Sequence, residues 1–345
     1  MSARVTNLTI LALLLIELGS GLGSLLVGSP GGSWVFWLHG AGGLSLVVLV
    51  TWKWRIVARS FARRRAGAWA VAPVLLGTIF VATLATGLWW AAVGRGSLPL
   101  PIYGSMRPLV LHTVLALVLI PPFIVHVAVR WPRARVADFA SRRAALRLLG
   151  VGAGGLVLSR GLVASSVLIG PDRRFTGSRE EASFTGNAHP VTNWLADRRQ
   201  RIEVAGWRLS VRGEVARPAE IDHAELSAMP MREQREILDC TGGWYTWQDW
   251  AGVPLEAVIA RARAAPEARS VVVRSVTGYS RRFALGEAGP LLLATHVGGE
   301  PLSAGHGFPV RLVAPGRRGY HWVKWVEAVE ISSLPAWWQP PLPTQ

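Results

Sequence analysis

Sulfur and negative charge are both scarce in this chain of 345 residues. It has one cysteine and four methionines, and 21 acidic side chains stand against 37 basic ones. A single cysteine excludes a disulfide framework within the chain. The formal net charge of +16 invites a nucleic-acid interpretation, but no basic motif with a recognition element accompanies it, so we expect no nucleic-acid partner.

Long hydrophobic runs fill the first half of the chain. Each approaches the roughly 20 residues that a helix needs to cross a bilayer. The five runs span about 9–28, 35–54, 68–93, 109–129 and 148–170. We therefore predict an N-terminal all-α bundle of five transmembrane helices in contact with membrane lipid.

The loops between these runs predict an orientation. RIVARSFARRRAG and RWPRARVADFASRRAALR are strongly basic, whereas SPGGSW and GRGSLPLPIYGSMRP carry little positive charge. By the positive-inside rule, the two basic loops are cytoplasmic. The sequence thus predicts a multi-pass protein of the bacterial inner (cytoplasmic) membrane, with residues 171–345 on the periplasmic side.

Three histidines lie inside the apolar runs: His39, His112 and His126. An ionisable side chain within a membrane helix indicates a functional site. His39 and His112 should lie at similar depths near the outer ends of their helices, which predicts a b-type haem with its iron between them. His126 follows His112 by fourteen positions, about 21 Å along a helix, and is a candidate ligand of a second haem. The equivalent position after His39 is Lys53, so that haem has no clear second ligand.

Gly40, Gly42 and Gly43 beside His39 would let a macrocycle lie against the helix, although glycines also suit plain helix packing. The histidines themselves have an alternative role in interhelical hydrogen bonds. In that case the helices are only an anchor, and a soluble partner supplies the electrons.

Cys240 begins the most informative part of the second half, in LDCTGGWYTWQDWAGVPLEAVI. About sixty residues later comes GHGFPVRLVAPGRRGYHWVKWVEAVEI. A lone thiolate suits a transition metal, and His306, Arg311 and Lys324 suit an anionic organic cofactor. A buried structural cysteine is the alternative, but the glycine pair and tryptophans that follow Cys240 favour a cavity.

The two stretches resemble the sulfite oxidase family of molybdenum enzymes over roughly residues 184–332, through the cysteine and an HGxPxR...G...VKW signature. In that family the cysteine sulfur binds molybdenum, and the dithiolene of molybdopterin supplies further sulfurs. SFTGNAHPVTNW, which contains Phe184, resembles a family motif in which an Asn-His pair binds the pterin, although an alanine separates Asn187 from His189 here. The resemblance implies molybdenum ligation by Cys240 and cofactor binding by Asn187, His189, Cys240, Thr241, His306, Arg311, His321 and Lys324.

The substrate expectation rests on a departure from that family. Sulfite oxidases place arginines shortly after the cysteine to bind an anion, whereas Gly243, Trp244 and Tyr245 stand here. A neutral, aromatic pocket favours a sulfoxide or an N-oxide, as in the periplasmic methionine sulfoxide reductases of the family, although Arg281 and Arg282 could restore charge. The catalytic candidates are Cys240, Tyr279 and Arg281, and the candidates for substrate orientation or proton delivery are His189, Tyr279, Arg281 and His296.

We predict three segments. Residues 1–134 form a four-helix transmembrane haem b-type domain, residues 135–172 hold a fifth helix, and residues 173–345 form a β-rich α+β molybdopterin-binding domain. The stretch from Ser141 to Arg147 resembles a twin-arginine export signal, or else marks the inner membrane face.

The whole chain is thus expected to be a membrane-anchored molybdopterin-dependent oxidoreductase. Haem b would relay electrons to or from the quinone pool or another membrane electron carrier. The alternatives are a sulfite-type oxidase that passes electrons to the membrane, and a membrane-anchored cofactor-binding protein without haem or turnover.

Overall fold

The computed structural model divides the chain into two compact units, Met1–Arg179 and Glu180–Gln345. It describes residues 2–63, 70–100, 104–131, 133, 135, 142–169, 173–194 and 197–340. The predicted segment boundaries at 134/135 and 172/173 stay predictions. Ser141 of the twin-arginine-like stretch lies outside the described residues.

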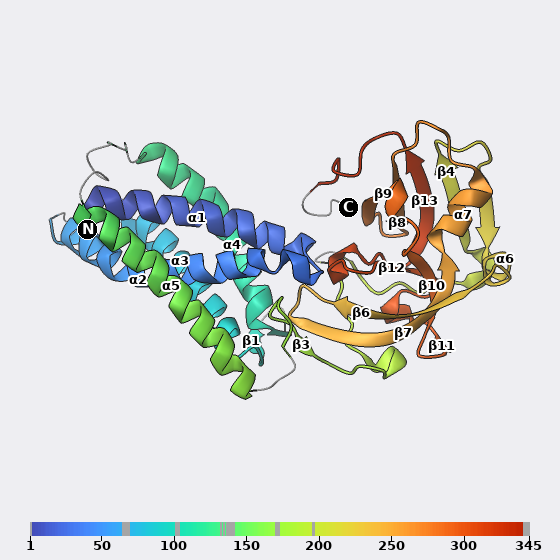
Figure 1. Ribbon diagram of the computed structural model, residues 1–345, viewed down its shortest axis with the longest axis horizontal. Coiled ribbons are helices and arrows are strands. Elements are labelled where there is room, and N and C mark those ends of the chain that lie inside the picture. The colour runs from blue at the N-terminus through green and yellow to red at the C-terminus, as the bar shows by residue number, and fades with distance from the viewer. Residues whose placement is uncertain are drawn as a thin grey trace. The chain divides into compact units, whose positions relative to one another are not determined.

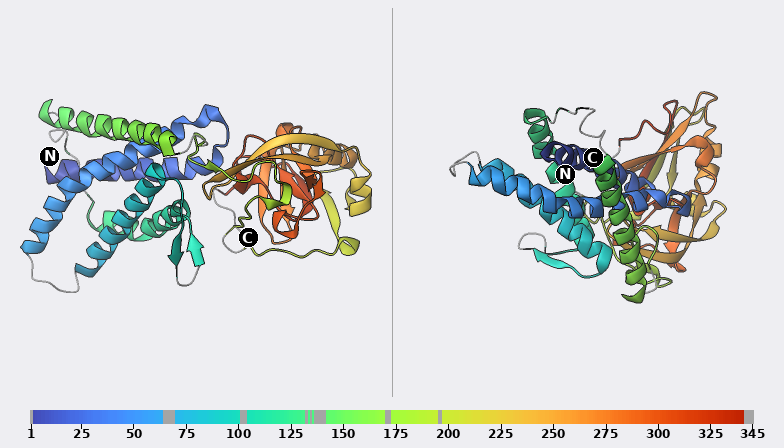
Figure 2. Two further views of the ribbon diagram at one scale, coloured as in Figure 1. Left: turned by 90° about the horizontal axis from the view of Figure 1, so that it is seen from below. Right: turned by 60° about the vertical axis from the view of Figure 1, so that its left-hand side comes forward.

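The first unit is helical (Figure 1). Its long helices are α1 (Ala3–Leu26), α2 (Trp34–Ala62), α3 (Val71–Ala92), α4 (Pro108–Val129) and α5 (Arg142–Ile169). All five are long and apolar enough to cross a membrane, which confirms the expected apolar helices. A short hairpin of β1 (Leu98–Leu100) and β2 (Gly104–Met106) lies between α3 and α4 (Figure 2).

Local chemistry sets where these helices begin. The Ser2 hydroxyl accepts a hydrogen bond from the Val5 N–H at 3.2 Å and caps α1. Pro108 occupies the first turn of α4, where its missing N–H costs nothing. The buried side chains of the unit include several hydroxyls rather than apolar groups alone: Thr6, Ser20, Ser45, Thr83 and Thr86.

The second unit is built on two β-sheets, and this confirms the expected β-rich domain. The first sheet contains β3 (Arg179–Glu180), β6 (Arg232–Asp239), β7 (Trp244–Pro254), β10 (Leu292–Val297), β11 (Glu300–Pro301) and β12 (Arg311–Val313). The second has the order β5 (Ala219–Asp222), β4 (Arg208–Gly213), β13 (Val326–Ser332), β8 (Ser270–Ser275), β9 (Ser280–Ala284). In that sheet β13 runs parallel to β4 and antiparallel to β8. Two short helices, α6 (His223–Ser227) and α7 (Leu255–Ala262), complete the unit.

Alternation along the strands builds its core. In β7, Trp244, Thr246, Gln248 and Trp250 are buried, while the residues between them are more exposed, as the two-residue period of a strand requires. Trp250 has no exposed surface. The β6–β7 hairpin therefore presents one face to the interior and ends in the turn that carries the cysteine.

Two local sequence patterns of this unit are confirmed. PLEAVIARARAA predicts a helix opened by Pro254, which is α7, and SVVVRSVTGYSRRFAL predicts a strand that turns at Gly278, where β8 turns into β9 with a φ of 85° that suits glycine. The alternation in YHWVKWVEAVEI predicts a strand through Lys324, but β13 begins only at Val326. Trp325 has a φ of 52°, so the backbone around Lys324 does not follow a regular strand.

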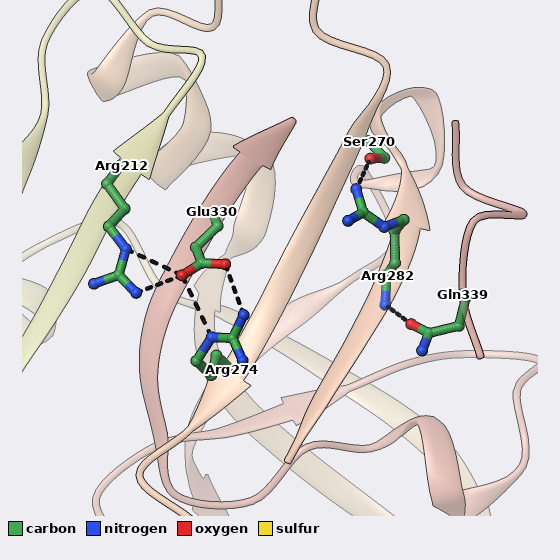
Figure 3. A network of polar contacts seen from close by, with 6 residues as sticks. All are labelled: Arg212, Ser270, Arg274, Arg282, Glu330 and Gln339. Carbon is green, nitrogen blue, oxygen red and sulfur yellow. Dashed lines mark hydrogen bonds and ion pairs between the residues drawn. The ribbon is translucent and has the colours of Figure 1, made fainter. Parts of the chain in front are cut away.

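Charged side chains connect strands of the second sheet (Figure 3). Glu330 of β13 accepts hydrogen bonds from Arg212 of β4 and from Arg274 of β8. Arg282 of β9 donates to the Ser270 hydroxyl at 2.7 Å, and its backbone N–H donates to the Gln339 side chain at 2.6 Å. The Gln339 bond ties the C-terminal segment to β9.

Candidate active site

The turn between β6 and β7 holds Cys240. The Cys240 N–H donates to the Trp244 carbonyl at 2.8 Å, and the Gly243 N–H donates to the Cys240 carbonyl at 3.1 Å. Gly243 has a φ of 90°, a conformation that favours glycine, so a glycine at this position allows the tight turn. The cysteine is only 7% exposed.

The groups around the Cys240 sulfur shift the pKa of its thiol in opposite directions. Burial raises the pKa of the thiol, whereas the Gly242 N–H, the Thr192 side chain and the Arg318 charge favour the thiolate. Gly242 N lies 3.3 Å from the sulfur. A metal cation at the sulfur would deprotonate it outright.

Arg318 supports the same turn. Its Nη2 donates to the Cys240 carbonyl at 2.9 Å, and its Nε lies 3.5 Å from the Asp239 carboxylate. Both members of this ion pair are buried. Arg318 therefore fixes the backbone on which the cysteine sits.

Lys324 reaches into the site from the segment before β13. Its ammonium donates to the Asn193 side chain at 2.7 Å and to the carbonyls of Gly305 and Thr192 at 2.8 and 3.1 Å. Burial first, and then the positive charge of Arg311, lowers the pKa of Lys324 to about 7. An anion bound nearby would restore the charge of this side chain.

Arg311, on β12, is buried between aromatic rings. Its guanidinium carbon lies 4.9 Å from the Trp250 ring centre and 5.4 Å from that of Trp322. Nε and Nη1 have no hydrogen-bond partner among the described residues. Burial lowers the pKa of Arg311 to about 9, while the neighbouring Cys240 acts in the opposite direction. Two buried donors without acceptors suit an anionic ligand.

His189 and His306 lie together, with ring centroids 4.0 Å apart. His306 Nε2 donates to the His189 carbonyl at 2.9 Å, and His189 Nδ1 donates to the Gly186 carbonyl at 2.7 Å, because carbonyls only accept. Burial lowers the pKa of His189 to about 3 and that of His306 to about 4. His189 Nε2, buried and without a partner in the described structure, is therefore an acceptor for a ligand N–H or O–H.

These groups share one cavity. It opens to solvent at its mouth. The structure places seven of the predicted site residues around it: Cys240, Thr241, His189, His306, Arg311, Lys324 and Tyr279.

Four other candidates lie outside the lining of this cavity. Asn187 accepts from the Ser303 N–H at 2.7 Å and donates to the Pro301 carbonyl at 2.9 Å, so its amide joins two loops. Arg281 and His321 are buried behind the cavity wall, and His296 lies on β10.

Arg281 and Tyr279 converge on Tyr320, which does line the cavity. The Tyr279 hydroxyl donates to the Tyr320 carbonyl, and Arg281 Nη2 donates to the Tyr320 hydroxyl. The guanidinium carbon lies 4.2 Å from the Tyr320 ring centre. Burial raises the pKa of Tyr279, which keeps its hydroxyl protonated as a donor.

Sequence reasoning missed several residues of the site. They are Thr192, Asn193, Asp197, Arg318, Tyr320 and Trp322. The first three lie within ten residues of His189, and the others lie in GRRGYHW, just before Lys324. Their closeness in sequence to His189 and to Lys324 is the signal that could have identified them.

The donor set fits a metal carried by an organic anion. Across the described ranges, no three His, Cys, Asp or Glu side chains converge into an all-protein metal site. One thiol and several buried cationic donors instead line the same cavity. A ligand bound there would have to supply most of its own metal coordination and bring negative charge.

The helical unit places two of its predicted ligands together. The ring centroids of His39 on α2 and His112 on α4 are 6.0 Å apart, with ring planes at 81°. His112 Nδ1 donates to the Thr83 carbonyl at 2.8 Å. His39 Nδ1 lies 3.0 Å from the Ser20 hydroxyl and 3.1 Å from the Glu17 carboxylate. With Nδ1 engaged in both rings, Nε2 is the nitrogen that carries the lone pair.

The glycines near His39 have a different role from the one expected. A Cβ on Gly42 would lie 2.1 Å from the Glu17 carboxylate, and a Cβ on Gly40 would lie 2.7 Å from the Ser159 hydroxyl. The space beside these two glycines therefore holds protein side chains. Two other glycines face the histidines. A Cβ on Gly87 of α3 would lie 2.9 Å from His112 ring atoms, and a Cβ on Gly21 of α1 would lie 3.3 Å from the His39 ring.

Lys53 and His126 differ from this pair. The Lys53 ammonium donates to the Asn7 side chain at 2.9 Å, a structural bond between α1 and α2. His126 is half-buried on α4. Its role as a second haem ligand stays a prediction.

Comparison with known proteins bears on the second unit. Residues 196–337 match the family of the oxidoreductase molybdopterin binding domain. An uncharacterized oxidoreductase, YuiH of Bacillus subtilis (strain 168), is 28% identical over 142 residues, which are 40% of this chain and 72% of the relative. The sulfane dehydrogenase SoxCD from Paracoccus pantotrophus has 25% sequence identity and a TM-score of 0.38, over 39% of this chain and 40% of that chain.

The family match spans the cysteine turn, the buried arginine and the lysine that line the cavity. It explains why one thiol and several cationic donors are gathered at one site, since molybdopterin is an anionic ligand that binds its metal through its own sulfurs. Residues 196–337 thus match an oxidoreductase molybdopterin-binding domain, and this match and the oxidoreductase relative support a molybdenum cofactor-dependent oxidoreductase.

Proposed function

We propose that the protein is a membrane-anchored oxidoreductase in which a b-type haem, ligated by His39 and His112, relays electrons between the molybdenum cofactor and the quinone pool. Another membrane electron carrier is an equivalent partner. The observation that carries the proposal is the geometry of this histidine pair.

Two imidazoles on one metal require a particular spacing. Metal–nitrogen bonds of about 2 Å on each side, added to the distance from each nitrogen to its ring centre, put the centroids about 6 Å apart. The observed 6.0 Å agrees with this spacing. Nδ1 hydrogen bonds hold both rings in the tautomer that a metal ligand needs.

The surroundings of the pair support a membrane location. The five helices expose large apolar side chains such as Leu75 and Val125, at 57% and 63%. Water would penalise such a surface, whereas lipid would not. By the positive-inside rule, the basic loops support a cytoplasmic N-terminus and a cofactor domain on the periplasmic side.

In the β-rich unit, Cys240 is the proposed molybdenum ligand. His306, Arg311, Lys324 and Thr241 would bind the pterin and its phosphate, and His189 Nε2 would accept a pterin N–H. The bound cofactor supplies two-electron oxygen-atom transfer. The chain holds and orients the cofactor and encloses the substrate. Asn187 and His321, which lie outside the lining of the cavity, stay predicted cofactor ligands.

The cavity wall supports an uncharged substrate such as a sulfoxide or an N-oxide. The part of the lining near the cysteine contains Trp244, Tyr279 and Tyr320, and the nearby Arg281 is bound to the Tyr320 hydroxyl. Arg281 also has two nitrogens, Nε and Nη1, without partners in the described structure. That observation favours a sulfite-type oxidase as the second candidate, because a small rearrangement would present charge to an anion.

The test combines composition with activity on detergent-purified full-length protein. Elemental analysis should find molybdenum near one per chain, and reduced-minus-oxidised spectra should show a b-type band that His112→Ala abolishes. Reduced quinol should then drive the reduction of methionine sulfoxide or trimethylamine N-oxide. If the preparation contains molybdenum but no haem, the helices serve only as an anchor. Sulfite oxidation without sulfoxide reduction would select the second candidate.

A further inference from the structure

Glu17 is the only acidic residue before Asp138, and it lies in the middle of the apolar helix α1. A carboxylate within such a helix is costly and indicates a function. Its side chain is 13% exposed, and Oε2 lies 3.1 Å from His39 Nδ1. Oε1 is buried without a hydrogen-bond partner in the described part of the chain.

The neighbouring helix is shaped around this carboxylate. A Cβ on Gly42 would lie 2.1 Å from Oε1, whereas a Cβ on Gly43 would make ordinary contact with Oε2 at 3.4 Å. Gly42 thus provides the space in which the Glu17 carboxylate approaches His39. A side chain at position 42 would displace the end of Glu17.

The two histidines have unequal partners. His112 Nδ1 donates to a neutral backbone carbonyl, that of Thr83, at 2.8 Å. His39 Nδ1 faces a carboxylate as well as the neutral Ser20 hydroxyl, which itself donates to the Ile16 carbonyl at 2.7 Å. Only the His39 side therefore has a partner that can carry a full negative charge.

We propose that Glu17 is a positioning residue that acts through His39: it holds the ring at Nδ1 and lowers the reduction potential of the haem. This inference rests on the proposed haem site. A hydrogen bond from Nδ1–H to a carboxylate makes the imidazole a stronger donor to iron, and the stronger donor stabilises ferric over ferrous iron.

The experiment is a redox titration of the haem in detergent-purified full-length protein. Glu17→Gln keeps the size and a hydrogen-bonding oxygen but removes the charge, so the midpoint potential should shift positive while the haem content stays at the wild-type level. Gly42→Ala should shift it in the same direction, because it displaces the carboxylate. Gly43→Ala is the matched control and should leave the potential unchanged.

The ferric spectrum gives an independent readout. Electron paramagnetic resonance of the low-spin haem should change in Glu17→Gln and Gly42→Ala in the manner of a weaker histidine donor, and not in Gly43→Ala. A merely structural carboxylate would leave the potential unmoved wherever haem is bound.

The possible failures are distinct. Wild-type protein without haem overturns the proposed function and this inference together. Haem present in every variant at one unchanged potential overturns only the inference. Should Glu17→Gln lose its haem, Gly42→Ala decides the question, and a wild-type potential in that variant overturns the inference.

Discussion

The two units of this protein differ in where most of their large apolar side chains lie. In the β-rich unit many of them form a buried core: Leu209, Val273 and Leu293 have no exposed surface. In the helical unit large apolar side chains such as Leu75 face outward, and Ser20 is among the buried hydroxyls. Each arrangement suits different surroundings, water for the first and lipid for the second.

The two candidate sites also differ in the side chains that they offer to a ligand. The cavity of the β-rich unit gathers buried cations and unpartnered donors, which suit a charged ligand that arrives from water. The helical unit offers two imidazoles whose Nδ1 atoms are both engaged by hydrogen bonds. In the proposed function, buried cations would hold the molybdenum cofactor, whereas the two imidazoles would hold the haem.

The largest effect is expected for a substitution that disrupts the molybdenum site and leaves the haem site intact. Cys240→Ser should lower oxygen-atom transfer activity by well over about a hundredfold, because even residues behind metal ligands change affinity or activity by about 10–100-fold. Molybdenum content should fall, while the b-type haem band stays. Parallel loss of the haem band would show that the two sites do not form independently.

Gly87 on α3 lies against the His112 ring and offers a test of the helical site. Gly87→Val should lower haem content about tenfold or more, because a side chain at 87 meets the His112 ring, whereas a Cβ on Gly77 of the same helix has nothing within 4 Å. Gly77→Val is the matched control. Haem content per chain measures both, and equal haem in the two variants would contradict the proposed ligation by His112.

Sequence patterns predicted the two units and much of both sites, but unequally. The five apolar runs and the cysteine and lysine motifs are local signals, and the structure places them as helices and as the wall of one cavity. Glu17 and Thr83 could not be assigned to the histidines, because interhelical packing determines which residues meet. Lys324 was misplaced in a strand, since nothing in YHWVKW reveals the positive φ of Trp325.

A pH profile separates the charged site from the apolar one. The pKa of Lys324 is lowered to about 7 without a ligand, so the cofactor-free unit gains stability as pH rises from about 7 toward the usual lysine pKa. A bound anion raises that pKa, and binding then takes up a proton. Cofactor retention should therefore weaken above pH 7, by at most about tenfold per pH unit.

The measurement is the rate of pterin release between pH 7 and 9, followed by fluorescence. Lys324→Met should release the cofactor faster and with a flatter profile. Haem retention should not follow the same pH dependence. An unchanged slope in Lys324→Met would assign the proton to another group.

The smallest effect concerns charges outside the cavity. Glu330 is 22% exposed and bridges three strands, whereas Asp249, at 52%, pairs only with Arg235. Burial alone would raise the pKa of Glu330, but the hydrogen bonds from Arg274 and Arg212 outweigh it and hold the pKa below its usual range. Its stabilising contribution is therefore present at neutral pH and disappears as pH falls through that lowered value.

Glu330→Gln should lower the protection of β13 amides against hydrogen exchange by an amount equal to about 1 kcal/mol at pH 7, because three hydrogen bonds to a charged, partly buried group weaken together. Asp249→Asn should cost less than about 0.5 kcal/mol, as exposed pairs do. Local exchange suits this test, since a chain of two units has no single unfolding transition to rely on. Equal protection in the two variants would mean that the bridged carboxylate of β13 stabilises its sheet no more than an exposed pair does. The stability of this sheet would then come from its buried core rather than from the Glu330 network. The β-rich unit and the helical unit would differ even more clearly in what stabilises them.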